Sequence, residues 1–161
     1  MPSSPEQLHT LFQQQIVAVE KLLKAMHAEN DALVQRDFDA LQASTAAKSE
    51  LTQSLEELGA LQQAFLAKNG QRNSVEGMDA YIAAQTKVAA QVLEQEKTKL
   101  HSLLEKCQTT NLISGNIIAA SRQSAETALA ILRGQLPSEN VLYTAGGQAV
   151  ADNSRDPLTK A

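Results

Sequence analysis

Apolar residues recur every three or four positions along most of the chain, which is the spacing of amphipathic helices. The first stripe consists of Phe12, Ile16, Val19, Leu23, Met26, Asn30 and Leu33, flanked by Leu8, Leu11 and Leu22. Ser4 can cap this helix, Pro5 suits its first turn, and Gln7 can complete a capping box. The pattern predicts a first helix near residues 4–36.

A second stripe follows almost at once. Asp37 can cap the new helix, and its apolar face holds Leu41, Leu51, Leu55, Leu58 and Phe65, with Lys48 between them. The short connection is either a tight turn or a kink. We favour a turn, because each stripe is too narrow to be buried without a partner helix. Lys68-Asn69-Gly70 is typical of a helix end, so we expect an antiparallel partner helix over residues 37–68.

The third helix is expected to be the longest. Ser74 or Gly77 can begin it, and no proline follows before Arg133, so residues 77–133 are predicted to be one helix. A pair of shorter helices covers only about half of that length at ~1.5 Å per residue. The remainder must project, bend back or pack on another chain. Ser114-Gly115-Asn116 is the weakest point for a bend.

The back half of this helix, Lys97–Arg133, carries its own stripe at the coiled-coil spacing. The stripe comprises Leu100, Leu104, Cys107, Asn111, Ser114, Ile118, Ser121, Ala125, Ala128 and Leu132. We interpret this stretch as a partner-binding surface that the shorter helices leave uncovered. The candidate contact residues are Leu100, Leu104, Asn111, Ser114, Gly115, Ile117, Ile118, Leu129 and Leu132. Two alternatives stay open: the stripe is ordinary core or a dimer seam, and Asn111 is a polar residue that sets coiled-coil register.

Residues 135–161 contain few large apolar side chains and a Gly146-Gly147 pair, so we expect a flexible tail after a helical bundle of residues 1–134. One apolar island, Val141-Leu142-Tyr143, interrupts the polar tail. Tyr143 is therefore a candidate contact for the bundle or for a partner.

Composition fits this picture. Hydrophobic residues make up 43% of the 161-residue chain but aromatic residues only 3%, which favours helices joined by leucine and alanine seams. The predicted fold is all-α: a helical hairpin plus a long third helix in a coiled-coil-like bundle. The net charge of −4 argues against nucleic acid as a partner. A single cysteine, no recognisable signal peptide and no apolar run of ~20 residues indicate a cytoplasmic protein without stable membrane insertion.

The sequence offers no catalytic or metal-binding constellation. His9, His27 and His101 lack partners at ligand spacing, and Cys107 lies on an apolar face where a buried, inert thiol is expected. No phosphate-binding glycine loop and no nucleophile elbow are present. We therefore expect a protein that is not an enzyme and needs no cofactor.

Three segments together resemble the FlgN family of flagellar export chaperones. The first is Ala32 to Leu41 followed by Lys48-Ser49-Glu50-Leu51, and the third is Tyr143-Thr144-Ala145-Gly146 in the tail. The second and most specific is Asn111-Leu112-Ile113-Ser114-Gly115-Asn116-Ile117-Ile118, similar to the family's Asn-x-x-Asn-Gly-x-Leu-Ile. Ser114 stands where the family pattern has its second Asn.

The resemblance implies a cytoplasmic chaperone for the hook-associated proteins FlgK and FlgL, which join hook and filament. Such a chaperone keeps these subunits unassembled and delivers them to the type III flagellar export apparatus. The alternative is a structural coiled-coil or scaffold protein that acts as a homo-oligomer. A third class, an enzymatic or metal-binding helical bundle, lacks candidate residues.

Overall fold

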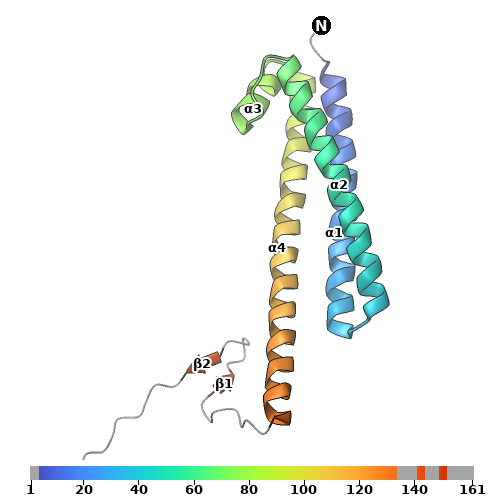
Figure 1. The fold of residues 1–161 in the computed structure, drawn as a ribbon. Helices are drawn as coiled ribbons and strands as arrows, with labels where there is room; N and C mark the ends of the chain where they lie inside the picture. Colours follow the sequence, from blue (N-terminus) through green and yellow to red (C-terminus); the bar gives the residue numbers. More distant parts are fainter. Residues whose placement is uncertain (1–3, 134–140, 144–148, 152–161) are drawn as a thin grey trace, which may run out of the picture. The chain divides into compact units, whose positions relative to one another are not determined.

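A computed structural model describes residues 4–133, 141–143 and 149–151 (Figure 1). The chain divides into two compact units, residues 1–115 and residues 116–161, and each is described by itself. The helices are α1 (Pro5–Gln35), α2 (Phe38–Lys68), α3 (Val75–Ala83) and α4 (Lys87–Leu132). The predicted helical class is confirmed. Within the described residues, no helix combines the length and apolar character needed to cross a membrane.

The connection between α1 and α2 is a tight turn of two residues. Arg36 takes the left-handed conformation at φ 57°, and its backbone N–H bonds to carbonyls in the last turn of α1. The Asp37 side chain then accepts a hydrogen bond of 3.0 Å from the Ala40 N–H, as its position before α2 predicted. At the other end of α1, Pro5 occupies the first turn as expected. The predicted capping box is wrong, because the side chain of Ser4 makes no capping hydrogen bond.

The loop between α2 and α3 depends on two glycines. Asn69 ends α2 as predicted, and Gly70 adopts φ 70°, which a residue with a Cβ rarely tolerates. Ser74 begins α3 and accepts a 3.1 Å hydrogen bond from the Gly77 N–H. A Cβ on Gly77 would lie 2.1 Å from the carbonyl oxygen of Arg72, so only glycine fits there.

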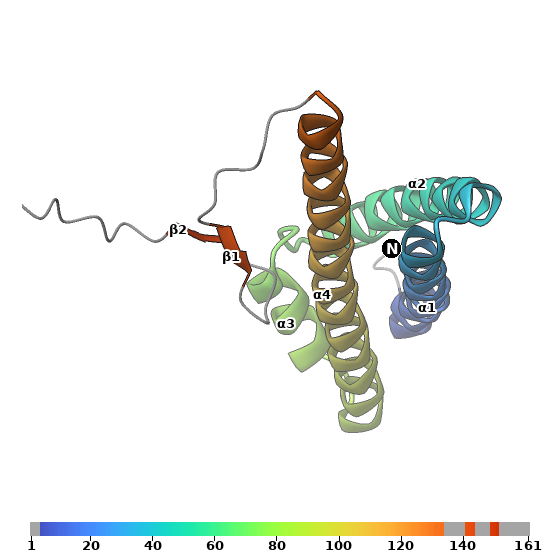
Figure 2. The same cartoon turned by 90° about the horizontal axis from the view of Figure 1, so that it is seen from below.

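The prediction of one helix over residues 77–133 is wrong. The helix breaks at Ala84–Thr86, which separates the nine-residue α3 from the 46-residue α4. Gln85 folds back to donate to the Tyr81 carbonyl, and Thr86 accepts from the Ala89 N–H at 3.4 Å. The break lets α3 bury Met78, Tyr81 and Ile82 while α4 runs on in its own direction, as Figures 1 and 2 show.

Helices α1 and α2 lie antiparallel, and polar side chains join them at two levels. The Lys48 ammonium group lies 2.8 and 3.0 Å from the Glu29 carboxylate oxygens, and Glu29 itself is buried. Gln15 donates to Gln62 at 2.9 Å further along. The first contact explains why a lysine interrupts the leucine stripe of α2: it neutralises a carboxylate buried in α1.

The first unit has two hydrophobic clusters in sequence along α1. The cluster nearer the N-terminus joins all four helices and contains Leu8, Phe12, Phe65, Leu66, Met78, Tyr81, Ile82 and Leu93. The ring centroids of Phe65 and Tyr81 lie 5.0 Å apart with an edge-to-face geometry. The second cluster joins α1 to α4 and contains Ile16, Val19, Met26, Leu103 and Cys107. These clusters position the middle of α4 against α1.

Part of the expected flexible tail is regular backbone. Strands β1 (Val141–Tyr143) and β2 (Ala149–Ala151) pair antiparallel, with Tyr143 opposite Ala149. These six residues correct the expectation of a tail without secondary structure. The other residues of the tail lie outside the described ones, so its flexibility stays a prediction.

Candidate partner-binding surface

The face of α4 that packs on the bundle is shifted from the predicted stripe. The buried positions up to Ser114 are Leu93, Glu96, Leu103, Cys107, Thr110 and Ser114, and Leu100 packs beside them. Leu103 and Thr110 are buried, whereas their neighbours Leu104 and Asn111 in the predicted stripe are exposed. The predicted and observed faces share Leu100, Cys107 and Ser114, so they are adjacent helical rows.

Polar contacts hold α1 and α4 in register. Lys99 pairs with Glu20 at 2.9 Å near the surface. Further along both helices, the Ser114 hydroxyl donates to the Asn30 side-chain oxygen at 2.5 Å, and both residues are buried. Residue numbers rise together in these pairs, so α1 and α4 run in the same direction.

Among the charged side chains that lie between α1 and α4, Glu96 is the most buried. Its Oε1 lies 2.7 Å from Nδ1 of His9 and accepts a 2.5 Å hydrogen bond from Gln13. Its Oε2 has no hydrogen-bond partner among the described residues. Glu96 is not among the residues that the sequence analysis singled out, yet it is buried. Its spacing to Leu93, Leu100 and Leu103 was the signal that it points inward.

The predicted contact residues of the first unit fall into two sets. Leu100 is half-buried and Ser114 is buried, so both already make contacts within the bundle. Leu104, Asn111 and Gly115 are exposed. A Cβ added to Gly115 would meet no atom within 4 Å, so this glycine is not needed for packing in the first unit.

The other helical candidates belong to the second unit. Ile118 is 54% exposed, Leu129 and Leu132 are also exposed, and Ile117 is half-buried. The helix itself continues through Ser114–Asn116, and the boundary between the two units falls at Gly115. Tyr143 lies in β1.

In the back half of α4, beyond Lys97, three further large apolar residues are exposed and were not among the candidates: Leu112, Ile113 and Ile131. Ile113, Ile117 and Ile131 share a helical row next to the predicted stripe, since their spacings of four and fourteen residues return to one face. The exposed apolar surface of α4 is therefore broader than one stripe. Ile113 and Ile131 could have been found from the sequence by counting the apolar residues of this second row.

The described residues offer no reactive centre. Burial raises the pKa of the Cys107 thiol, which keeps it protonated and unreactive. No cluster of His, Cys, Asp or Glu within the described part of the chain has the geometry to hold a metal ion. What the structure does provide is exposed apolar side chains on α4, and such side chains on a helix can bind other helices.

The described residues are mainly helical, and α4 carries exposed apolar side chains. The chain matches the family model described as FlgN protein over residues 1–151, and it belongs to the FlgN family. This is a family of flagellar export chaperones, as the resemblance in the sequence predicted. No curated protein and no solved structure matches the chain significantly.

Proposed function

We propose that this protein is a cytoplasmic chaperone for the hook-associated proteins FlgK and FlgL. It keeps these subunits unassembled and delivers them to the flagellar export apparatus. Membership of the FlgN family supports the class of function. The observation that carries the choice of surface is the exposure of Leu104, Ile113, Ile118, Leu129 and Leu132 along α4.

In this proposal a terminal helix of the client packs its apolar face on α4. A subunit that polymerises through terminal helices must have them covered until export, and an exposed apolar helix covers them by side-chain interdigitation. Asn111 and Gly115 lie within this surface, where Asn111 can hydrogen-bond to the client and Gly115 permits close approach of its backbone. Ile117 and Ile118 supply the apolar contacts at the same level, and Tyr143 is a further contact in the tail.

The affinity is expected to be moderate. A client segment that becomes ordered on binding loses conformational entropy, which offsets part of the free energy gained by burying apolar surface. Moderate affinity suits a chaperone that must release its client at the export apparatus. We expect dissociation constants on the order of micromolar.

The test is a calorimetric titration of the purified chain with FlgK and with FlgL, followed by titration with each client lacking its terminal helices. The proposal expects binding of the full clients and loss of binding after truncation. Light scattering on the free chain addresses the alternative of a scaffold. A stable homo-oligomer that binds neither client would favour self-association through α4 and contradict the proposal.

A further inference from the structure

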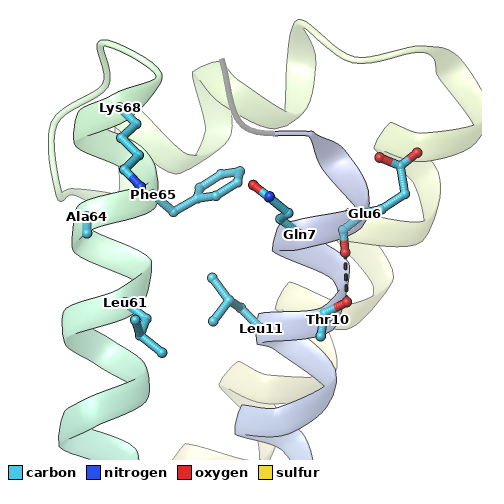
Figure 3. Close-up of a pocket in the computed structure, with 8 residues that line it drawn as sticks. All are labelled: Glu6, Gln7, Thr10, Leu11, Leu61, Ala64, Phe65 and Lys68. Atoms are coloured by element: carbon cyan, nitrogen blue, oxygen red, sulfur yellow. Dashed lines mark hydrogen bonds between the residues drawn. The ribbon is translucent and has the colours of Figure 1, made fainter. Parts of the chain in front are cut away.

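A continuous furrow runs along the face shared by α1 and α2. One section, of about 420 Å³, is lined by Leu11, Leu61 and Phe65 among others, and Figure 3 shows Leu11 and Leu61 directed toward each other across it. A second section, of about 640 Å³, is lined by Val17, Leu51, Leu58 and again Leu61. Because Leu61 lines both sections, they form one furrow.

The apolar residues of this furrow lack a covering element in the first unit. Leu61 is 56% exposed and Val17 is 47% exposed. The buried residues of α2, a helix that the structure describes in full, are Ser44, Phe65 and Leu66. The leucine stripe of α2 therefore has α1 on one side and an open flank on the other, which is the position of an additional helix in a bundle.

The charged side chains that line the furrow are Glu6, Lys21 and Lys68. Glu6 is already engaged: hydrogen bonds from Ser4 and from its own backbone N–H lower its pKa, and Figure 3 shows its carboxylate directed away from α2. Lys21 and Lys68 form no ion pair with any residue that the structure describes. The free charges of the furrow are therefore two cations.

These two lysines lie near opposite ends of the furrow. Lys21 lines the same section as Leu51 and Ser54 of α2. Lys68 lies a further 14 to 17 residues along α2, which corresponds to roughly 20–25 Å at ~1.5 Å per residue. A partner that spans the furrow as a helix needs about four to five turns and meets a lysine near each end.

We propose that this furrow docks an amphipathic helix of a partner protein, with leucine-like side chains facing the furrow and a carboxylate near each end. A second copy of this chain fits less well. A two-fold contact centred on the furrow would bring Lys21 of one copy toward Lys68 of the other, and like charges repel. The furrow lies on α1 and α2, so it is separate from the α4 surface proposed for clients.

The probe is a designed helical peptide of about 18 residues, long enough to span the furrow, with leucine at helical spacing and glutamate near both ends. A matched peptide has lysine at those end positions. Fluorescence anisotropy measures the binding of both peptides to the full chain. We expect the glutamate peptide to bind at least about tenfold more tightly than the lysine peptide, since each end exchanges an attraction for a repulsion.

Three variants locate the site. Leu61→Glu places a charge in the middle of the furrow and should weaken binding of the glutamate peptide by more than about tenfold. Val34→Glu is the matched control, because Val34 is also exposed on the same pair of helices but outside the lining residues. The double change Lys21→Glu/Lys68→Glu should reverse the preference between the two peptides. Circular-dichroism melts of each variant establish that the fold is retained.

Equal affinity for the two peptides, or equal effects of Leu61→Glu and Val34→Glu, would overturn the proposal. A native dimer in light scattering that Leu61→Glu dissociates would also overturn it, because a second copy would then occupy the furrow. The peptides do not depend on any flagellar client, so failure here leaves the proposed function untouched. Failure of client binding likewise leaves this test valid.

Discussion

The Ser114 hydroxyl on α4 donates to the side-chain oxygen of Asn30 on α1 at 2.5 Å, and this contact is buried. The same hydroxyl lies 3.1 Å from the Thr110 carbonyl oxygen. Apolar packing between the two helices ends nearby, at Met26 and Cys107. A specific polar contact therefore fixes the register of α4 beyond the point where hydrophobic burial does so.

We predict that Ser114→Ala lowers the free energy of unfolding by about 1–3 kcal/mol, because it leaves the buried Asn30 amide without its partner. Asn111→Ala is the control, since Asn111 is exposed three residues away, about one helical turn, and it should change stability by less than ~0.5 kcal/mol. Urea denaturation of both variants measures the difference. Equal effects would contradict a structural role for the Asn30–Ser114 contact.

Lys48 on α2 should stabilise the protein through Glu29. Lys48→Met removes the cation beside a buried carboxylate and should cost about 1–2 kcal/mol, less than a fully buried pair because Lys48 itself is partly exposed. Lys24→Met is the control, because Lys24 is exposed on α1. Thermal melts of both variants provide the comparison. A melting temperature for Lys48→Met no lower than that of the control would show that Glu29 is satisfied without the lysine.

Two glycines should respond to alanine in opposite ways. Gly77→Ala places a Cβ against the Arg72 carbonyl oxygen and should destabilise the protein by more than ~2 kcal/mol. Gly115→Ala has open space and a helical backbone, so it should stabilise the protein by about 0.5–1 kcal/mol. Guanidinium denaturation gives both values. Destabilisation by Gly115→Ala would show that this glycine has a packing role in the free protein.

Glu76, in the first turn of α3, should contribute to the acid dependence of stability. The hydrogen bond from its own backbone N–H, together with that from Ser74, lowers its pKa below the ordinary value of 4.5. A carboxyl group with a lowered pKa stabilises the fold above its unfolded pKa, and this contribution is lost as the pH falls through the folded pKa. Glu76→Gln should therefore be less stable than the native chain at neutral pH, and this difference should shrink as the pH falls below 4.5. If the difference in stability between Glu76→Gln and the native chain does not change with pH, the Glu76 carboxylate does not contribute to the acid dependence.

Local signals in the sequence were sufficient for most helix ends. Asp37 and Ser74 cap the helices that their positions predicted, and Asn69 and Gly70 end α2. The break before α4 was missed because Thr86 is a weak cap with no glutamate three residues later to mark it. Tertiary packing favours the break, because it lets Tyr81 and Ile82 join the hydrophobic core near Leu8.

The register of α4 could not be settled from its own sequence. The rows through Leu103 and Leu104 are equally apolar, and the choice between them depends on which one meets Val19 and Met26 of α1. The same limit applies to the candidate site. Leu100 and Ser114 looked like free surface because the stripe alone does not show what α1 covers, whereas Leu104, Ile118, Leu129 and Leu132 are exposed.

The central claim is that α4 binds the client, and it is tested most directly with Ile117→Asp and Ile118→Asp. Each variant is titrated calorimetrically with a hook-associated protein and melted in parallel, with Val88→Asp as the control because Val88 is exposed at the other end of α4. Placing an unpaired carboxylate in an apolar contact costs several kcal/mol, a large part of the ~8 kcal/mol of a micromolar complex. The account predicts loss of client binding in both variants, with melting temperatures close to that of the control. Unchanged affinity with the fold intact would contradict it, and a fall in stability of both variants would show that these residues belong to the protein's own core.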